Sequence, residues 1–410
     1  MTTTINNEHK KLNVPNSTDK GNVIRNVPAL RFPEFEGEWK KEQLGDTADF
    51  SKGAGISKEQ LSEKGEPCIL YGELYTKYKS EVIYDIISKT DIDSTKLVRS
   101  QANDVIIPSS GETAEDIATA RCVLKNNILL GGDLNIIRLH NHSGSFMSYQ
   151  LNGKRKYDIA KVAQGVSVVH LYAEHLKGVN TYNPCMEEQE KIARLLSLLD
   201  ERIATQNKII EDLKKLKSAI IEKLYSKIQG KEYSYGQLFE VINERNKQME
   251  YSNILAASQE KGMVNRDDLN LDIQFERSNI DIYKIVRKGD YVIHLRSFQG
   301  GFAFSNMTGV CSPAYTILRP STLLEYGYLS YYFKSYRFIK SLIIVTYGIR
   351  DGRSISVEEW LNLKISIPSK EHQLHILKVL RSFDLKIENE ETYASCLSNQ
   401  KQYLLRQMFI

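Results

Sequence analysis

Residues 187–228 read EEQEKIARLLSLLDERIATQNKIIEDLKKLKSAIIEKLYSKI, and this stretch decides the fold of the chain. It holds no glycine or proline, and its apolar residues recur at alternating steps of three and four, interrupted only by polar Gln206 and Lys217. This spacing is the heptad pattern of a coiled coil. With a rise of about 1.5 Å per residue, it predicts a helix of roughly 60 Å whose narrow apolar stripe needs a partner. The apolar positions are Ile192, Leu196, Leu199, Ile203, Ile210, Leu213, Ile220 and Leu224.

A second copy of this stretch, 184 residues further along the chain, is the predicted partner. At that offset the apolar positions keep their phase, and the polar positions Gln206 and Lys217 fall on Glu390 and Lys401. A shared motif also precedes both helices, where a proline blocks earlier helix extension and a glutamate in the first turn complements the helix dipole. The motif is Pro184-x-x-Glu187-x-Gln189-x-x-Ile192 in the first copy and Pro368-x-x-Glu371-x-Gln373-x-x-Ile376 in the second.

The residues before each helix also correspond to one another. Strand-like runs at 103–107 and 134–138 match runs at 289–293 and 315–319, and a polar loop containing glycine follows the first run of each set. Helices are expected to open at Ser148 and Ser330. We therefore predict an α+β fold: two globular mixed α/β units separated by two long antiparallel α-helices that form an intramolecular coiled coil, with a pseudo-twofold internal repeat. If the helices pack antiparallel, the molecule is expected to be a dumbbell.

The predicted organisation divides the chain into five parts. A flexible polar tail is expected over 1–27, followed by residues 28–39 (PALRFPEFEGEW), which are expected to lie extended over a domain surface. The predicted segments are 1–27 tail, 28–183 first globular domain, 184–229 first long helix, 230–367 second globular domain and 368–410 second long helix.

Composition narrows the class of protein without fixing its function. A formal net charge of +4 permits nucleic-acid binding but does not demand it. No apolar run approaches the length of a membrane span, so no membrane association is expected. The five cysteines are scattered and never form a CxxC motif, which indicates reduced, buried thiols and a cytoplasmic location.

A search for catalytic motifs finds no defensible active site. No phosphate-binding P-loop, GxSxG or HExxH string is present. His140 with His142, and His372 with His375, have spacings that could bind a metal, but neither pair has an evident third ligand, so we interpret them as surface histidines. Glu112 and Asp116 are sufficiently explained by a polar loop beside a strand. The prediction is a protein with no metal, no cofactor and no enzymatic activity of its own.

Basic and aromatic residues gather instead inside each globular unit. Lysine and arginine neutralise phosphates, glutamine reads adenine, and serine and tyrosine position the nucleic-acid backbone. Some of these side chains are expected to be ordinary surface charges, but the two sets together favour DNA binding. The predicted DNA contacts are Lys52, Ser109, Ser110, Arg121, Lys154, Arg155, Lys156, Arg296, Ser297, Gln299, Arg337, Arg350 and Arg353.

The outer helix faces near the two motifs still carry apolar residues after the seam is assigned. We predict that these faces bind a partner protein; the alternative is that they only pack against their own globular units. The predicted partner contacts are Ile192, Leu195, Leu198, Ile376, Leu377 and Val379.

Residues 28–39, the two variable units and the duplicated Pro-x-x-Glu-x-Gln-x-x-Ile helices together resemble the specificity subunit of type I restriction–modification enzymes. The resemblance implies that each globular unit is a target recognition domain reading one half of a split, asymmetric site in double-stranded DNA, and that the helices set the spacer. It also implies two modification subunits, which carry S-adenosylmethionine and methylate adenine, and restriction subunits that use ATP and Mg. The runner-up interpretation is a coiled-coil scaffold that binds protein and not DNA; a methyltransferase or nuclease with divergent motifs is a third.

Overall fold

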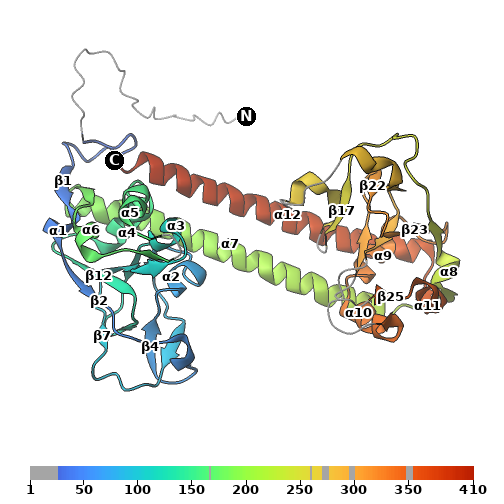
Figure 1. Ribbon diagram of the computed structural model, residues 1–410, viewed down its shortest axis with the longest axis horizontal. Helices are drawn as coiled ribbons and strands as arrows, with labels where there is room; N and C mark the ends of the chain where they lie inside the picture. Colours follow the sequence, from blue (N-terminus) through green and yellow to red (C-terminus); the bar gives the residue numbers. More distant parts are fainter. Residues whose placement is uncertain (1–25, 166–167, 259–260, 270–276, 295–300, 348–353) are drawn as a thin grey trace, which may run out of the picture. The chain divides into compact units, whose positions relative to one another are not determined.

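The computed structural model describes residues 26–165, 168–258, 261–269, 277–294, 301–347 and 354–410. The chain forms two compact units: the first joins the residues up to Ile203 with Leu397–Ile410, and the second is Ala204–Cys396. Each unit holds part of two long helices, α7 (Met186–Ser226) and α12 (Lys370–Gln407), together with strands and short helices (Figure 1). The predicted fold class is confirmed.

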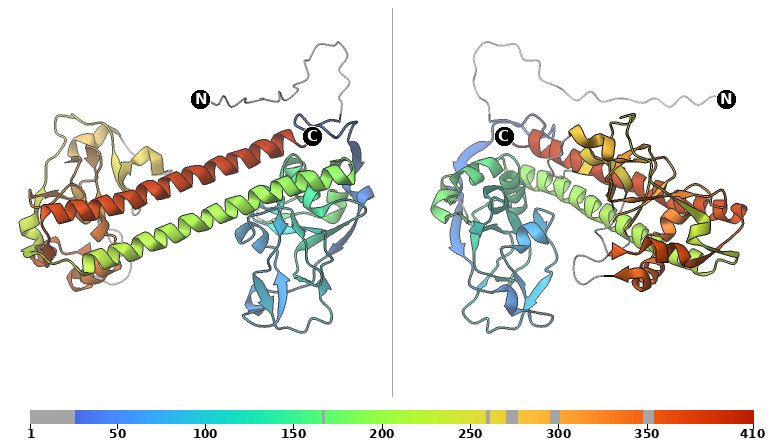
Figure 2. Two further views of the ribbon diagram at one scale, coloured as in Figure 1. Left: turned by 180° about the vertical axis from the view of Figure 1, so that it is seen from behind. Right: turned by 45° about the vertical axis from the view of Figure 1, so that its right-hand side comes forward.

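Within each unit, α7 and α12 lie side by side and antiparallel (Figure 2). In the first unit the start of α7, with Ile192 and Leu196, packs against Leu405 and Met408 at the end of α12. In the second unit the end of α7 shares a core with the start of α12. The predicted seam positions that are buried are Ile192, Leu196, Leu199, Ile210, Ile376, Leu380, Ile387, Leu397 and Met408.

The polar seam residues Gln206 and Glu390 mark the centre of the pair formed by α7 and α12. Gln206 Nε2 donates to the Glu390 backbone oxygen at 3.2 Å and to the Glu390 carboxylate. These two residues occupy the same repeat position, 184 apart. When two copies of one helix pair antiparallel, equivalent positions face each other only at the middle of the pair. The contact between Gln206 and Glu390 is such a contact, so the sequence offset and the observed register agree.

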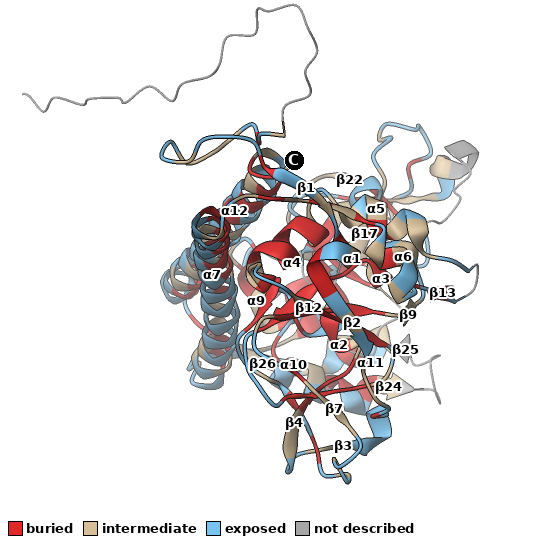
Figure 3. Cartoon of the chain, turned by 90° about the vertical axis from the view of Figure 1, so that its left-hand side faces the viewer, coloured by how far each residue is buried: buried red, intermediate tan, exposed pale blue. Residues whose placement is uncertain are grey.

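The first unit is built on a five-stranded sheet of order β2-β12-β8-β10-β5, in which only the β5–β10 pair is parallel. Every residue of β8 is buried, and the buried helix α4 packs against β8 and β10 (Figure 3). The strands of this sheet are β2 (Ala48–Lys52), β5 (Val82–Ile83), β8 (Asp104–Pro108), β10 (Arg121–Val123) and β12 (Leu134–Leu139). The helices before α7 are α1 (Leu44–Thr47), η1 (Lys58–Gln60), α2 (Glu73–Thr76), α3 (Ala114–Ile117), α4 (Gly144–Asn152), α5 (Lys156–Val162) and α6 (Ala173–Lys177).

A second five-stranded sheet, of order β3-β6-β4-β11-β7, and two ribbons complete this unit. The β1–β14 ribbon leads directly into α7, and β9 pairs with β13. These strands are β1 (Lys40–Gln43), β3 (Leu61–Ser62), β4 (Glu66–Ile69), β6 (Ser88–Thr90), β7 (Val98–Arg99), β9 (Ser110–Gly111), β11 (Leu129–Leu130), β13 (Val169–His170) and β14 (Asn180–Asn183).

The second unit has a four-stranded antiparallel sheet of order β16-β23-β20-β21. Its β15–β26 ribbon leads into α12 as β1–β14 leads into α7. The strands are β15 (Lys231–Ser234), β16 (Phe239–Ile242), β17 (Leu255–Ser258), β18 (Gly262–Asn265), β19 (Lys284–Val286), β20 (Tyr291–Ile293), β21 (Phe302–Phe304), β22 (Gly309–Cys311), β23 (Thr316–Pro320), β24 (Thr346–Tyr347), β25 (Ser354–Ile355) and β26 (Lys364–Ile367). The helices are α8 (Tyr235–Leu238), η2 (Arg266–Leu269), η3 (Arg277–Ile282), α9 (Tyr328–Tyr332), α10 (Tyr336–Ser341), η4 (Leu342–Val345) and α11 (Val357–Asn362).

Buried ion pairs confirm which strands are equivalent. Arg138 on β12 binds the Asp104 carboxylate through two nitrogens, at 2.9 and 2.8 Å. Arg319 on β23 binds Asp290 in the same way, at 3.0 Å through each nitrogen. Both aspartates are almost fully buried, so these arginines neutralise charges inside the fold.

Some local expectations differ from the structure. Helix α4 begins at Gly144 and not at Ser148, because the Ser143 hydroxyl accepts from the Phe146 N–H and caps the helix earlier. Helix α9 begins at Tyr328, directly after Gly327, whose φ is 77°. The cysteine prediction is also partly wrong: three are buried, but Cys185 and Cys396 are exposed.

Candidate nucleic-acid interface and partner faces

The glutamine of the Pro-x-x-Glu-x-Gln motif ties each long helix to its globular unit. Gln189 donates to the Pro184 carbonyl at 2.9 Å and accepts from the Ser143 N–H at 3.0 Å. In the second unit Gln373 donates to the Pro368 carbonyl at 3.1 Å and accepts from the Glu325 N–H at 2.8 Å. Both glutamines are buried. The motif therefore orients a helix against the unit before it, a role that proline and the dipole alone do not explain.

Three of the predicted DNA contacts come together at one edge of the first unit. Lys52 ends β2, Ser109 follows β8, and Ser110 lies opposite His170 in the β9–β13 ribbon. The Lys52 ammonium lies 6.0 Å from the centre of the Tyr172 ring, and His170 stacks on that ring. Lys52, His170 and Tyr172 are exposed, as phosphate or base contacts must be.

His170 and Tyr172 were missed at the sequence level. They follow the sequence Gly165-x-Ser167, and Gly352-x-Ser354 holds the same place in the sequence of the second unit. The signal that was available is therefore positional: a Gly-x-Ser sequence that recurs in both units shortly before the last short helix.

Arg121 was predicted to contact DNA, and its placement argues against this. The side chain is buried, and its guanidinium donates to the backbone carbonyls of Leu74, Ala120 and Tyr78 at 3.2, 3.1 and 3.0 Å. A charged group with all its donors engaged inside the unit cannot reach a phosphate. We leave it out of the interface.

In the Lys154-Arg155-Lys156 run, the arginine is held by other residues of the fold and, among the residues that the structure describes, the two lysines are not. Arg155 donates to the backbone oxygen of Ile410 at 2.9 Å, pairs with Asp158 at 3.1 Å and stacks over Tyr182, so it anchors the end of the chain. Lys154 is exposed, and Lys156, at the first position of α5, is partly exposed. Only the two lysines are placed to meet DNA.

In the second unit most of the predicted contacts lie outside the described residues: Arg296, Ser297, Gln299, Arg350 and Arg353. Arg337, on α10, is described and exposed. By the strand equivalence, the sequence that follows β20 holds the place that Ser109 and Ser110 have after β8.

A tyrosine, an aspartate and a lysine meet at equivalent positions in both units. In the first, the Tyr149 hydroxyl donates to Asp200 at 2.8 Å, and Lys401 pairs with Asp200 at 2.5 Å. In the second, the Tyr331 hydroxyl donates to Asp384 at 2.5 Å, and Lys217 pairs with Asp384. Burial raises the pKa of both tyrosines, so they act as neutral donors.

The first of these triads has an additional member. Glu81, which directly precedes β5, also pairs with Lys401, and this carboxylate is buried. Burial raises the pKa of Glu81 above its ordinary value, while the Lys401 charge acts to lower it. The two carboxylates at this site compete for one lysine, with Arg121 nearby as a second cation.

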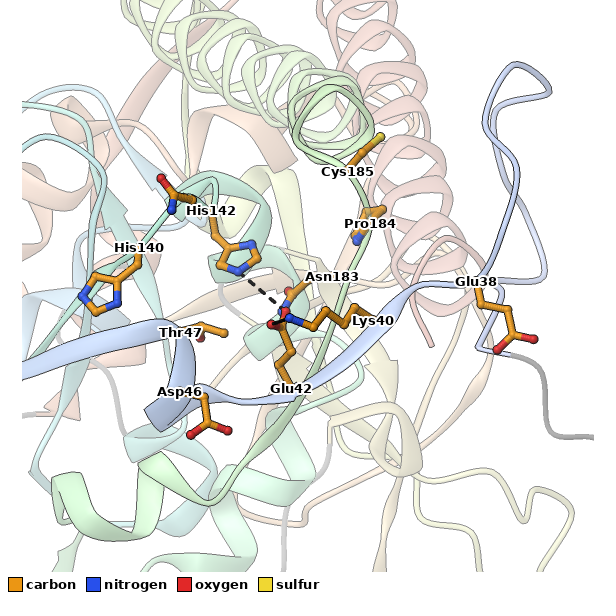
Figure 4. Close-up of a pocket in the computed structure, with 11 residues that line it drawn as sticks. Glu38, Lys40, Glu42, Asp46, Thr47, His140, His142, Asn183, Pro184 and Cys185 are labelled. Atoms are coloured by element: carbon orange, nitrogen blue, oxygen red, sulfur yellow. Dashed lines mark hydrogen bonds and ion pairs between the residues drawn. The ribbon is translucent and has the colours of Figure 1, made fainter.

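A cleft of about 570 Å³ lies where the β1–β14 ribbon meets the start of α7, lined among others by Lys40, Glu42, His142 and Asn183 (Figure 4). Glu42 Oε2 lies 3.7 Å from His142 Nε2 and accepts from the Asn183 amide at 3.0 Å. Burial lowers the pKa of His142 and keeps it neutral. Among the described residues, no three histidine, cysteine or carboxylate side chains are placed to hold a metal ion.

The predicted partner contacts are corrected in part. Ile192, Ile376 and Leu377 are at most 1% exposed, because they pack into the cores of their own units. Leu195 and Val379 are partly exposed, and Leu198 is 50% exposed. Exposed apolar side chains that the sequence reasoning missed are Ile209 and Leu216 on α7, and Leu374, Leu385, Tyr393 and Tyr403 on α12.

Comparison with known proteins identifies related chains. Residues 36–215 match the model of the type I restriction modification DNA specificity domain. The type I restriction enzyme MjaVIII specificity subunit of Methanocaldococcus jannaschii is 26% identical over 208 residues, which are 50% of this chain and 45% of that protein. The putative MjaX specificity subunit of the same organism is 22% identical over 392 residues, 88% of this chain and 91% of that one.

Two solved structures share the fold. The S subunit of a type I restriction–modification system from M. genitalium superposes with a TM-score of 0.56 at 17% identity, covering 94% of this chain and 99% of that one. A chain from a structural study of complex assembly and conformational transition in a type I system superposes with a TM-score of 0.57 at 14% identity. The superposition covers 90% of this chain and 97% of that one. In the part of the chain that the structure describes, no helix is long and apolar enough to cross a membrane. Residues 36–215 match the family of type I restriction–modification DNA specificity domains, and the chain is similar to the specificity subunits of such systems.

Proposed function

We propose that this chain is the non-catalytic subunit that reads DNA for a type I enzyme, each globular unit recognising one half of a bipartite, asymmetric site. The observation that carries the proposal is the duplication: two units with equivalent sheets, each fixed to one end of a paired helix by a buried glutamine. Two readers held on one spacer recognise two blocks of sequence separated by base pairs that neither reader touches.

In the first unit, the proposed reading edge is formed by Lys52, Ser109, Ser110, His170 and Tyr172. Lys52 would neutralise a phosphate, the serines would position the backbone, and the exposed histidine and tyrosine would meet sugar or base edges. The second unit would read with Arg337 and with the residues whose sequence position follows β20. The two stretches differ in sequence, which supports two different half-sites.

The outer faces of the long helices are the proposed docking sites for two modification subunits. On α7 the exposed side chains Leu198, Ile209 and Leu216 are 11 and 7 residues apart, which are close to whole numbers of helical turns and place them along one stripe. On α12, Leu374 and Leu385 are likewise 11 residues apart. Each long helix therefore offers exposed apolar side chains along one side, and exposed apolar surfaces of this kind mark protein interfaces.

The rest of the reaction belongs, on this proposal, to the partners. The modification subunits supply S-adenosylmethionine and adenine methylation, and restriction subunits supply ATP- and Mg-dependent translocation and cleavage, in the cytoplasm. We propose no cofactor for this chain.

Substituting Leu198 tests the docking face. Leu198→Glu places a charge on a side chain that is 50% exposed, so the fold should hold while co-purification with the modification subunit is lost. Leu124→Glu, on a 38% exposed leucine of the first unit that lies outside the helices, is the matched control and should co-purify normally. Normal co-purification of Leu198→Glu would reject this face as the docking site.

A further inference from the structure

The internal repeat allows the two Tyr–Asp–Lys triads to be compared position by position. Asp104 and Asp290 are equivalent, because each starts the central strand and binds the arginine of the neighbouring strand. One residue further on, Val105 pairs with Cys122 and Tyr291 pairs with Phe304. The strands β10 and β21 are therefore equivalent, with Cys122 at the place of Phe304.

The next strand in each unit runs parallel to this one and extends the equivalence. In the first unit, Val123 pairs with Ile83 of β5. In the second, the equivalent Ser305 forms a parallel bridge with Met263 of β18. Two residues before Ile83 is Glu81, and two residues before Met263 is Lys261.

A carboxylate in one unit is thus replaced by an ammonium group in the other. Glu81 pairs with Lys401 and closes the first triad within the fold. Lys261 lines a cleft of about 230 Å³ together with Lys217, Tyr331, Lys334 and Asp384 of the second triad. Among the described residues that line this cleft, Lys217 and Lys261 stand against Asp384, whereas in the first triad Lys401 and Arg121 are balanced by Glu81 and Asp200.

The two triads also differ in solvent exposure, and the second is the more exposed. The Asp200 and Lys401 side chains are 7% and 10% exposed, while Asp384 and Lys217 are 46% and 21% exposed. Lys261 and Asn306, which also lines the cleft, are exposed. The Asn306 amide oxygen accepts from the Tyr326 hydroxyl at 3.0 Å. The second triad is open to solvent.

We propose that this cleft binds the carboxylate of an acidic side chain of the modification subunit. That carboxylate would take the role in the second triad that Glu81 has in the first. A protein carboxylate is favoured over other anions because the equivalent position in the first unit is filled by one. Lys217 of α7 and Asp384 of α12, the helices on which docking is proposed, both line the cleft. The inference rests on that proposed docking and adds that the two docking sites are unequal.

Lys261→Glu reproduces the first unit's arrangement in the second and tests the proposal. The new carboxylate should pair with Lys217, so the full-length variant should melt no lower than the wild type at low salt. Its affinity for the purified modification subunit of the same system should fall on the order of tenfold, which corresponds to about 1.4 kcal/mol. The loss should be larger at 50 mM than at 200 mM salt.

Lys247→Glu makes the same charge change on an exposed lysine of this unit outside the cleft, and should leave affinity unchanged. Equal affinity of Lys261→Glu and Lys247→Glu would overturn the inference while leaving docking intact, whereas no binding by the wild type would overturn the docking itself. Weakened binding to random duplex DNA with unchanged modification-subunit affinity would identify a phosphate as the ligand and also reject the proposal. A Lys261→Glu protein that melts well below the wild type would contradict the strand equivalence.

Discussion

At the scale of single residues, Lys401 is the most consequential charge in the first unit. It neutralises two buried carboxylates, Glu81 and Asp200. Lys401→Met leaves both without their lysine, and breaking a buried ion pair in this way costs about 3–5 kcal/mol. The equivalent change Lys217→Met frees an aspartate that is 46% exposed and should cost less than about 1 kcal/mol.

The cost of Lys401→Met should depend on pH. Burial already raises the pKa of Glu81 above 4.5, and removing the lysine that lowers it raises that pKa further. A carboxyl with a raised folded-state pKa stabilises the fold below its unfolded pKa, and this contribution is lost as pH rises through the folded value. The loss in free energy of unfolding caused by Lys401→Met should therefore be smaller at pH 4.5 than at pH 7.5.

The two tryptophans allow the measurement to be made unit by unit. Trp39 is buried in the first unit and Trp360 in the second. Urea unfolding followed by Trp39 fluorescence in a Trp360→Phe background should report the Lys401→Met effect. Equal losses for Lys401→Met and Lys217→Met, or a deficit that does not change with pH, would contradict this account of the buried cluster.

Lys52 is the residue on which the proposed reading edge can be tested. If it neutralises one phosphate, Lys52→Gln should reduce the slope of log affinity against log salt by about 1. Lys89→Gln, on an exposed lysine of β6, should leave the slope as in the wild type. Duplex binding titrated over a range of salt gives both slopes, and a wild-type slope for Lys52→Gln would remove this residue from the interface.

At the scale of elements, the long helices were predictable and the loops were not. A heptad seam depends only on spacing, so its buried positions and its partner followed from the sequence offset. Which basic side chains face outward depends on contacts that spacing does not encode. Arg121 and Arg155 were predicted to bind DNA, yet backbone carbonyls inside the first unit hold both. The roles of Gln189 and Gln373 were likewise visible only once the strand order was known.

The helix pair is the proposed ruler, and its length can be changed in register. Adding one heptad after Asn207 in α7 and one after Glu391 in α12 keeps the seam in phase and lengthens the pair by about 10 Å. At roughly 3.4 Å per base pair, the unread spacer should grow by about three base pairs. A heptad in α7 alone should instead mismatch the pair and destabilise the protein. Binding-site selection on the doubly extended chain reports the spacer, and an unchanged spacer would show that the helices do not set it.

At the scale of the whole molecule, the duplication is what would let one chain serve the proposed asymmetric site. The repeat keeps the helices, the central sheet and the helix-anchoring glutamine, while the loops and the sheet edges diverge. The family match over residues 36–215 covers most of the first unit and most of α7, and the equivalence of the second unit rests on the repeated strand order and ion pairs. On the proposed docking, the divergence at Glu81 and Lys261 makes the two partner contacts unequal.

The central claim is that two readers on one spacer recognise a split sequence. Methylome sequencing of cells that express this chain with its modification subunit tests it most directly, because the methylated sites report the target outright. The account predicts methylated adenines in two short, different blocks separated by a fixed number of base pairs of any sequence. Methylation confined to a single continuous block, or to two blocks at variable separation, would contradict it.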